Sequence, residues 1–106
     1  MKEKTFFKHL DNEGLERIRM RIKVDKGKIL DMMIQYESSI DCKWTAIIRY
    51  DCAHGFFHRD VLTPQGDTEK QTLAIENLDF GLQYAEQDIK DRWKFYKHRY
   101  IKKIKK

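Results

Sequence analysis

Residues 49–60, with the sequence RYDCAHGFFHRD, hold most of the side chains in this chain that could carry out a reaction. Imidazole exchanges protons near neutral pH, and a neighbouring carboxylate fixes its orientation. A guanidinium binds phosphate or carboxylate through two parallel hydrogen bonds. A tight connection between two strands inside the segment would bring these groups together. The expected site combines Arg49, Asp51, His54, His58 and Asp60.

Strand alternation restricts which of these side chains can cooperate, because successive strand residues point to opposite faces. A strand predicted at 44–51 has Arg49 and Asp51 on one face. Its other face carries Trp44, Ala46, Ile48 and Tyr50. A strand predicted at 56–62 has His58 and Asp60 on one face, and Arg59 falls on the other with Phe57 and Val61.

These residue types match a metal-independent phosphodiesterase that acts on RNA. One histidine would act as base towards the 2′-hydroxyl, the other as acid towards the leaving oxygen, and arginine would stabilise the charged phosphorane. The expected roles are acid and base for His54 and His58, orientation for Asp51 and phosphate binding for Arg49, with no metal and no cofactor.

Two other interpretations of the segment stay open. His54 and His58 with Asp51 or Asp60 could hold zinc, manganese or iron, although a His-x-x-x-His spacing aligns its ligands best on a helix. Alternatively, the same side chains only tie a hairpin together through hydrogen bonds and ion pairs.

The elements that position the segment follow from hydrophobic periodicity. Apolar residues alternate with Arg17, Arg19, Arg21 and Lys23 over residues 17–24, which predicts a half-buried strand. A turn at 25–28 leads to a strand at 29–37, whose Asp31 and Glu37 could neutralise those cations. A turn at 38–43 precedes the strand at 44–51, and residues 5–10 form either an edge strand or part of a loose arm over 1–14. The fold class predicted is α+β, an antiparallel meander of about four strands packed by one long C-terminal helix.

The helix is predicted to begin near Asn77, a favourable N-cap, and to extend towards Ile104. Its apolar stripe contains Leu78, Leu82, Ala85, Ile89, Trp93, Tyr96 and Tyr100. A helix of about 28 residues would be about 42 Å long, so the end at 97–106 should protrude from so small a domain.

Positive charge is concentrated at that helix end. Residues 90–106 contain nine Lys or Arg and one Asp, which leaves the first 89 residues with a net charge of −3. Such asymmetry is typical of a protein that binds a polyanion or an acidic protein, although a solvated helix end gives the same pattern. The expected nucleic-acid contacts are Arg59, Lys97, Arg99, Lys102 and Lys103.

Length and composition predict one globular domain over residues 1–106. The chain is 41% apolar, contains one proline and has no apolar run of the roughly 20 residues that span a bilayer. Its N-terminal residues lack the apolar core of a signal peptide, and Cys42 and Cys52 lack metal or redox spacing. We expect a cytoplasmic protein with two reduced thiols and no membrane partner.

The pattern RYDxAHGFxHRD, with its preceding strand, Pro64, Gly66 and the long helix, resembles a family of small uncharacterised prokaryotic proteins classed as a domain of unknown function. More distantly, Arg49, Tyr50, Asp51, Ala53, His54 and His58 are similar to the motif of TumE-type toxin components of toxin-antitoxin pairs. This chain lacks the Asn and Pro of that motif and has Arg59 in place of its second late histidine.

The resemblance implies a small protein that acts on nucleic acid with a partner such as an antitoxin. We therefore expect a protein directed to RNA or DNA, in the form of a toxin-like ribonuclease. The alternative is a non-enzymatic module in which residues 49–60 are structural and the helix end binds a partner or a second copy.

Overall fold

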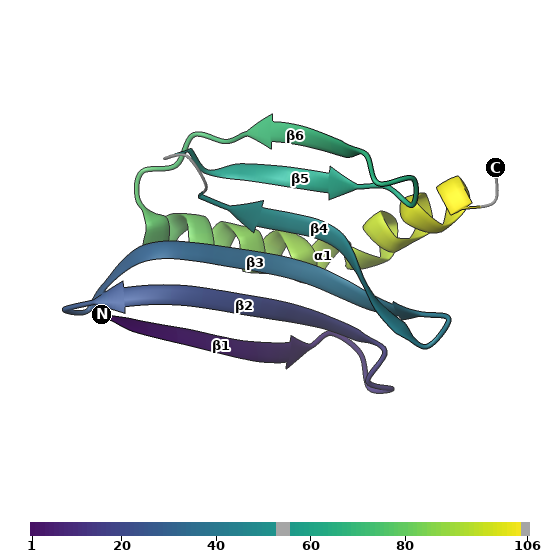
Figure 1. The fold of residues 1–106 in the computed structure, drawn as a ribbon, viewed down its shortest axis with the longest axis horizontal. Coiled ribbons are helices and arrows are strands. Elements are labelled where there is room, and N and C mark those ends of the chain that lie inside the picture. The colour runs from purple at the N-terminus through teal and green to yellow at the C-terminus, as the bar shows by residue number, and fades with distance from the viewer. Residues whose placement is uncertain (53–55, 105–106) are drawn as a thin grey trace.

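The computed structural model describes residues 1–52 and 56–104, which form one sheet and one helix (Figure 1). The strands are β1 (Lys2–His9), β2 (Glu16–Asp25), β3 (Lys28–Ile40), β4 (Lys43–Asp51), β5 (His58–Leu62) and β6 (Thr68–Thr72). They lie in the order β1-β2-β3-β4-β5-β6, and each pairs antiparallel with the next. The α+β meander with a C-terminal helix is confirmed, but the sheet has six strands rather than about four.

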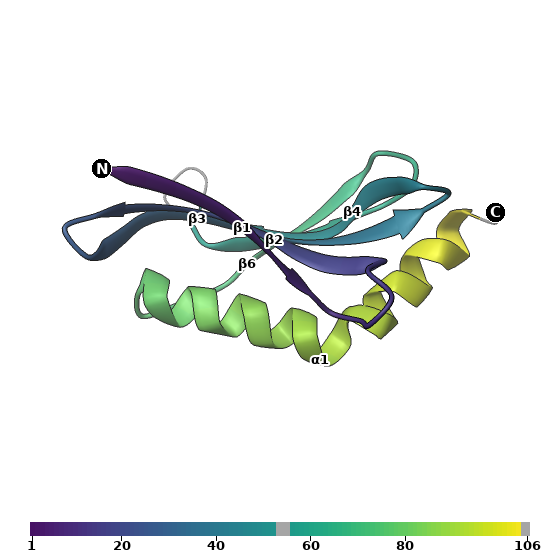
Figure 2. The same cartoon turned by 90° about the horizontal axis from the view of Figure 1, so that it is seen from below.

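The helix α1 (Leu78–Ile104) packs against one face of the sheet and makes the second layer of the molecule (Figure 2). It begins where predicted, because the backbone N–H of Phe80 donates a 2.8 Å hydrogen bond to Asn77 Oδ1. Ala85, Ile89 and Tyr96 of α1 are buried against the central strands. The buried strand residues of this core are Ile18, Met20, Ile22, Met32, Ile34, Tyr36, Ile47, Ile48 and Tyr50.

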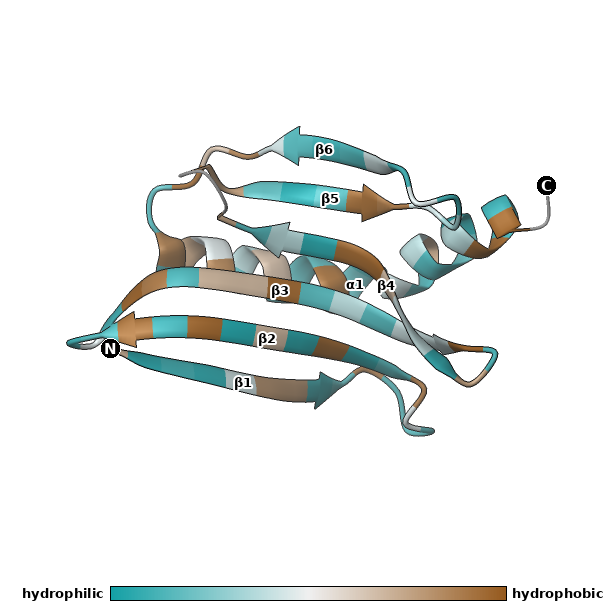
Figure 3. Cartoon of the chain, viewed as in Figure 1, coloured by the Kyte–Doolittle hydropathy of each residue, from teal (hydrophilic) through white to brown (hydrophobic). Residues whose placement is uncertain are grey.

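Alternation gives the sheet two unlike faces, and the ribbon of β2 changes between hydrophobic and hydrophilic along its length (Figure 3). The side chains of Ile18, Met20 and Ile22 point towards α1 and are buried. The intervening Arg17, Arg19 and Arg21 therefore point away from the helix. We call the side that packs against α1 the helix face and the other side the open face.

The two strands beyond the predicted four lie at the edges of the sheet. Residues 2–9 pair with β2 along their whole length, from Lys2 opposite Val24 to His9 opposite Arg17, so the N-terminal residues form a strand rather than a loose arm. Thr68–Thr72 is exposed throughout and contains no apolar side chain. An edge strand that packs nothing has no hydrophobic period for a sequence pattern to detect.

A register shift in the β3–β4 pair corrects the predicted faces of β4. Tyr36 lies opposite Ile48 but Glu37 lies opposite Ala46, which leaves Ile47 as an extra residue. Such a bulge exchanges the faces on its two sides. Trp44 consequently contacts Arg17 on the open face instead of sharing a face with Ile48 and Tyr50.

The last turns of α1 extend beyond the end of the sheet where the β3–β4 turn lies (Figure 1). They are held from two sides, because Gln65 Nε2 donates a 3.0 Å hydrogen bond to the carbonyl of Lys103, and Lys97 Nζ lies 2.6 Å from Glu16 Oε2. No helix among the described residues is long and apolar enough to cross a membrane. Cys42 and Cys52 are both present as thiols.

Candidate functional site

The strand register aligns the polar residues of the open face in two neighbouring rows that cross the sheet. One row contains Phe7, Arg19, Gln35, Arg49, Asp60 and Lys70, each opposite the next on the adjacent strand. The other contains Thr5, Arg21, Met33, Asp51, His58 and Thr72. Because neighbouring strands lie about 4.8 Å apart, each row places its side chains within reach of one another.

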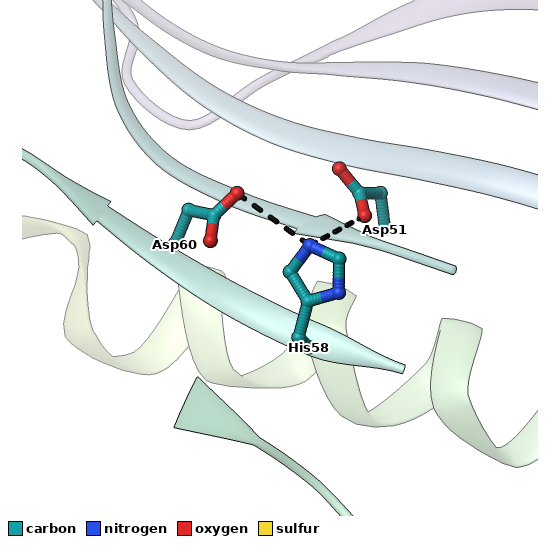
Figure 4. Close-up of side chains that lie close together, drawn as sticks. All are labelled: Asp51, His58 and Asp60. Atoms are coloured by element: carbon teal, nitrogen blue, oxygen red, sulfur yellow. Dashed lines mark ion pairs between the residues drawn. The ribbon is translucent and has the colours of Figure 1, made fainter. Parts of the chain in front are cut away.

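Asp51, His58 and Asp60 meet where the two rows cross from β4 to β5 (Figure 4). His58 Nε2 lies 2.7 Å from Asp51 Oδ1 and 3.6 Å from Asp60 Oδ2. His58 Nδ1 lies 3.3 Å from the carbonyl oxygen of Phe56. Both ring nitrogens therefore lie beside oxygen atoms that can accept a hydrogen bond. The expected approach of Asp51 and His58 is present, whereas His54, the third residue expected there, lies outside the described residues.

Two of the three side chains in this cluster are buried, so their polar atoms are removed from water. His58 and Asp60 are only 4% and 6% exposed, and Oδ1 of Asp60 is buried without a hydrogen-bond partner among the described residues. Burying polar and ionisable groups is costly unless each is paired and hydrogen-bonded. The three side chains also offer a possible ligand set for a metal ion, since one ligand atom from each lies within 4.8 Å of the others.

Arg49 extends the cluster towards the middle of the sheet. Its Nε donates a 2.7 Å hydrogen bond to Gln35 Oε1, and Gln35 Nε2 donates a 2.6 Å hydrogen bond to Glu37. Arg49 and Asp51 border a hollow of about 260 Å³ whose wall also contains Arg21, Asp31 and Met33. This hollow adjoins Asp51 directly, while His58 does not line it.

The arginines of β2 are only partly neutralised. Glu37 lies 2.8 Å from Arg17 and 4.0 Å from Arg19, as the charge pattern predicts, and Arg21 lies 3.6 Å from Glu3. Nε of Arg19 is buried without an acceptor among the described residues.

Two aromatic rings of the open face pack against Arg17, the first of the β2 arginines. The Arg17 guanidinium lies 4.3 Å from the ring centre of Phe7 and 3.7 Å from that of Trp44. The partly neutralised arginines of β2 therefore lie beside two exposed aromatic rings, those of Phe7 and Trp44.

Other predicted site residues lie elsewhere. Arg59 is on the helix face, where its Nη1 donates a 3.1 Å hydrogen bond to the Tyr96 hydroxyl, and Arg99 is on α1 near it. Lys97, Lys102 and Lys103 lie on the last turns of α1. His54 lies outside the described residues. The basic helix end is thus on the side of the sheet away from Asp51 and His58, so the two predicted regions do not form one surface (Figure 2).

Each face of the sheet carries a hydrogen-bond network, and some residues of these two networks are not among the predicted site residues. Gln35 joins Arg49 to Glu37 on the open face, and its position follows only once the hairpin register is known. On the helix face, Asp88 accepts hydrogen bonds of 2.5 Å from Tyr50 and 2.6 Å from Tyr96. Burial, followed by the bond to Asp88, raises the pKa of Tyr96 to about 12 and that of Tyr50 still further.

Comparison with known proteins identifies a family but no activity. The family model described as "Domain of unknown function (DUF7718)" matches residues 1–106. No curated protein matches the chain, and no solved structure matches it.

Proposed function

The chain belongs to the DUF7718 family, whose description assigns no activity, and from the geometry of the open face we propose that the protein binds and cleaves single-stranded RNA. The observation that carries the proposal is the 2.7 Å contact between Asp51 and His58 beside Arg49, on a sheet face lined by arginines. A proton-transfer pair, an anion-binding group and a cationic approach surface are the parts that phosphodiester cleavage by the 2′-hydroxyl requires.

The cationic approach surface consists of Arg17, Arg19, Arg21 and Lys23, together with Phe7 and Trp44. Guanidinium groups bind the phosphate backbone, and exposed rings stack with bases of any sequence, a combination typical of single-strand binding. Phe7 and Trp44 are 48% and 42% exposed, so both rings offer surface to a base. The distant helix end is not needed for this surface.

The hollow beside Asp51 is where the scissile phosphate would sit. Arg49 and Arg21 border the hollow and can hold the phosphate oxygens, whereas Asp51 faces the same space. The 2′-oxygen attacks phosphorus as the bond to the 5′-oxygen breaks, which yields a 2′,3′-cyclic phosphate. Arg49 then faces the negative charge that develops on the phosphorane.

Proton transfer is divided between Asp51 and His58. Asp51 borders the hollow and its side chain is 21% exposed, so it contacts the 2′-hydroxyl, while the buried His58 shares the proton with it through their 2.7 Å contact. His58 is in this sense a positioning residue. The proton for the leaving 5′-oxygen is expected from His54, which lies outside the described residues.

Cleavage of a mixed-sequence RNA oligonucleotide by the purified protein in excess EDTA tests the proposal. We expect a 2′,3′-cyclic phosphate product, and a rate at least about 100-fold lower for Asp51→Asn, because general acid–base groups contribute factors of that size. His58→Gln should also lower the rate, because it removes the imidazole that shares the proton with Asp51. His98→Gln, at an exposed position on α1, is the matched control and should retain full activity.

The outcomes separate the proposal from a binding role. Wild-type activity in His58→Gln and Asp51→Asn would overturn the assignment of the site. Binding of RNA without cleavage by the native protein would overturn the reaction and leave a non-enzymatic module.

A metal-dependent reaction at the same cluster is a second candidate, and the unpartnered buried oxygen of Asp60 favours it. Asp51, His58 and Asp60 would then bind a divalent ion through one ligand atom each, and the ion would activate a water molecule. Cleavage that is lost in EDTA and restored by Mn²⁺ would select this candidate over the metal-independent reaction.

A further inference from the structure

A second concentration of arginine lies on the helix face, in a pocket of about 330 Å³ between the second half of α1 and the strands β5 and β6. The helix runs behind β3 and β4, and β5 and β6 lie to one side of it (Figure 1). Arg59, Arg92 and Arg99 line the pocket together with Phe95 and Tyr96. We call this space the arginine pocket.

Arg59 forms the fixed inner wall of the arginine pocket. Its Nη1 donates hydrogen bonds of 3.1 Å to Tyr96 and 3.4 Å to Tyr50, its Nη2 donates to Gln71, and Asp88 Oδ2 lies 3.6 Å away. These contacts hold the guanidinium in one orientation. Its Nε is nevertheless buried with no acceptor among the described residues, so one donor at this wall is unused.

Arg92 and Arg99 form the outer wall, and both lie over the rings of the same two aromatic residues. The Arg92 guanidinium is 5.6 Å from the ring centre of Phe95, and that of Arg99 is 5.3 Å from it. Tyr96 is 5.9 Å and 5.5 Å from the same two groups. Phe95 is largely exposed at the rim of the pocket. A flat aromatic surface thus stands beside three guanidinium groups.

The charge of the arginine pocket is not balanced by the protein. Three arginines line it, and Glu69 is the one acid among the described lining residues, while Lys70 lies opposite Asp60 in the open-face row. Asp88 behind the inner wall neutralises one further charge, through contacts of 3.6 Å with Arg59 and 3.9 Å with Arg92. One positive charge remains in excess, and the described residues show no ion pair for Arg99.

We propose that the arginine pocket binds a nucleotide, with a phosphate group against Arg59, Arg92 and Arg99 and the base stacked on Phe95. Guanidinium pairs bind phosphate through parallel hydrogen bonds, and an exposed aromatic ring accepts any base. The volume is at the small end of the range for ligand pockets, which fits a mononucleotide or the terminal nucleotide of a strand. This site is separate from Asp51 and His58 and does not depend on the proposed cleavage.

Isothermal titration of the full chain with AMP, adenosine and inorganic phosphate tests the proposal. We expect AMP to bind at least tenfold more tightly than either adenosine or phosphate, because both parts of the ligand contribute. Arg99→Ala should weaken AMP binding at least tenfold, and Phe95→Ala should weaken AMP more than phosphate. Both side chains are at least partly exposed and neither makes the several hydrogen bonds that Arg59 makes, so these variants should fold.

Lys28→Ala, at an exposed cation outside both proposed sites, is the matched control and should leave AMP affinity unchanged. Equal weakening by Lys28→Ala and Arg99→Ala would indicate diffuse attraction and overturn the proposal, as would equal affinity for AMP and adenosine or no binding of AMP at millimolar concentration. A short DNA strand with a 5′-phosphate, compared with the 5′-hydroxyl strand, then separates the sources of the nucleotide. Tighter binding of the phosphorylated strand than of AMP identifies a strand end, and the reverse order identifies a free nucleotide.

Discussion

The two faces of the sheet carry the same kinds of polar residue in opposite settings. On the helix face, Tyr50 and Tyr96 belong to the apolar core, and together with the partly exposed Arg59 they converge on one carboxylate, that of Asp88. On the open face, no helix of the described part of the chain covers the rows, and polar contacts follow one another from Arg17 through Glu37 and Gln35 to Arg49. The comparison indicates that packing against α1 stabilises the fold, which leaves the open face able to carry charge.

The largest effect expected from this division concerns stability. Ile89→Ala removes a fully buried side chain between α1 and the sheet, and we expect it to lower the free energy of unfolding by about 2–5 kcal/mol. Phe7→Ala on the open face should cost less than about 1 kcal/mol, because that ring is half exposed. Urea denaturation measures both. Similar losses of unfolding free energy in the two variants would contradict the conclusion that packing against α1, and not the open face, stabilises the fold.

A smaller effect concerns pH, through the hydroxyls that point to Asp88. The folded state keeps the proton on Tyr96 until about pH 12, whereas the ordinary tyrosine pKa is 10.0, so its stabilising contribution is complete below pH 10 and is lost between pH 10 and about 12. The raised pKa of Tyr50 acts in the same direction.

Denaturation at pH 9 and pH 11 measures this contribution. We expect the loss of stability between these values to be smaller in Tyr96→Phe than in the native protein. A loss of equal size in both would show that Tyr96 titrates as it does in the unfolded chain.

Much of the fold follows from residue patterns, because the central strands and the helix each bury one face. The alternation of residues 17–24 and the Asn77 cap predict β2 and the start of α1 closely. β6 could not be predicted, since its exposed residues TEKQT carry no apolar period. The bulge at Ile47 was also beyond prediction, because an extra residue is visible only in the register of two paired strands.

The candidate site was predictable for a related reason, and only in part. Asp51 ends β4 and His58 begins β5, so alternation across a short connection predicts that they face each other, as they do. The separation of Arg59 from this group follows from the same alternation. The side of the sheet on which α1 packs depends on tertiary packing and cannot be predicted from the sequence pattern. That side determines the separation of the basic helix end from Asp51 and His58.

The most direct test of the division between the faces is the response of the arginine Nε–Hε signals in NMR spectra to RNA. A 2′-O-methyl oligonucleotide with a 5′-hydroxyl cannot be cleaved by the proposed reaction and offers no terminal 5′-phosphate to the arginine pocket. We predict that the signals of Arg19, Arg21 and Arg49 shift on titration, whereas those of Arg92 and Arg99 do not. Shifts confined to Arg92 and Arg99 would contradict the assignment of the open face as the RNA-binding surface.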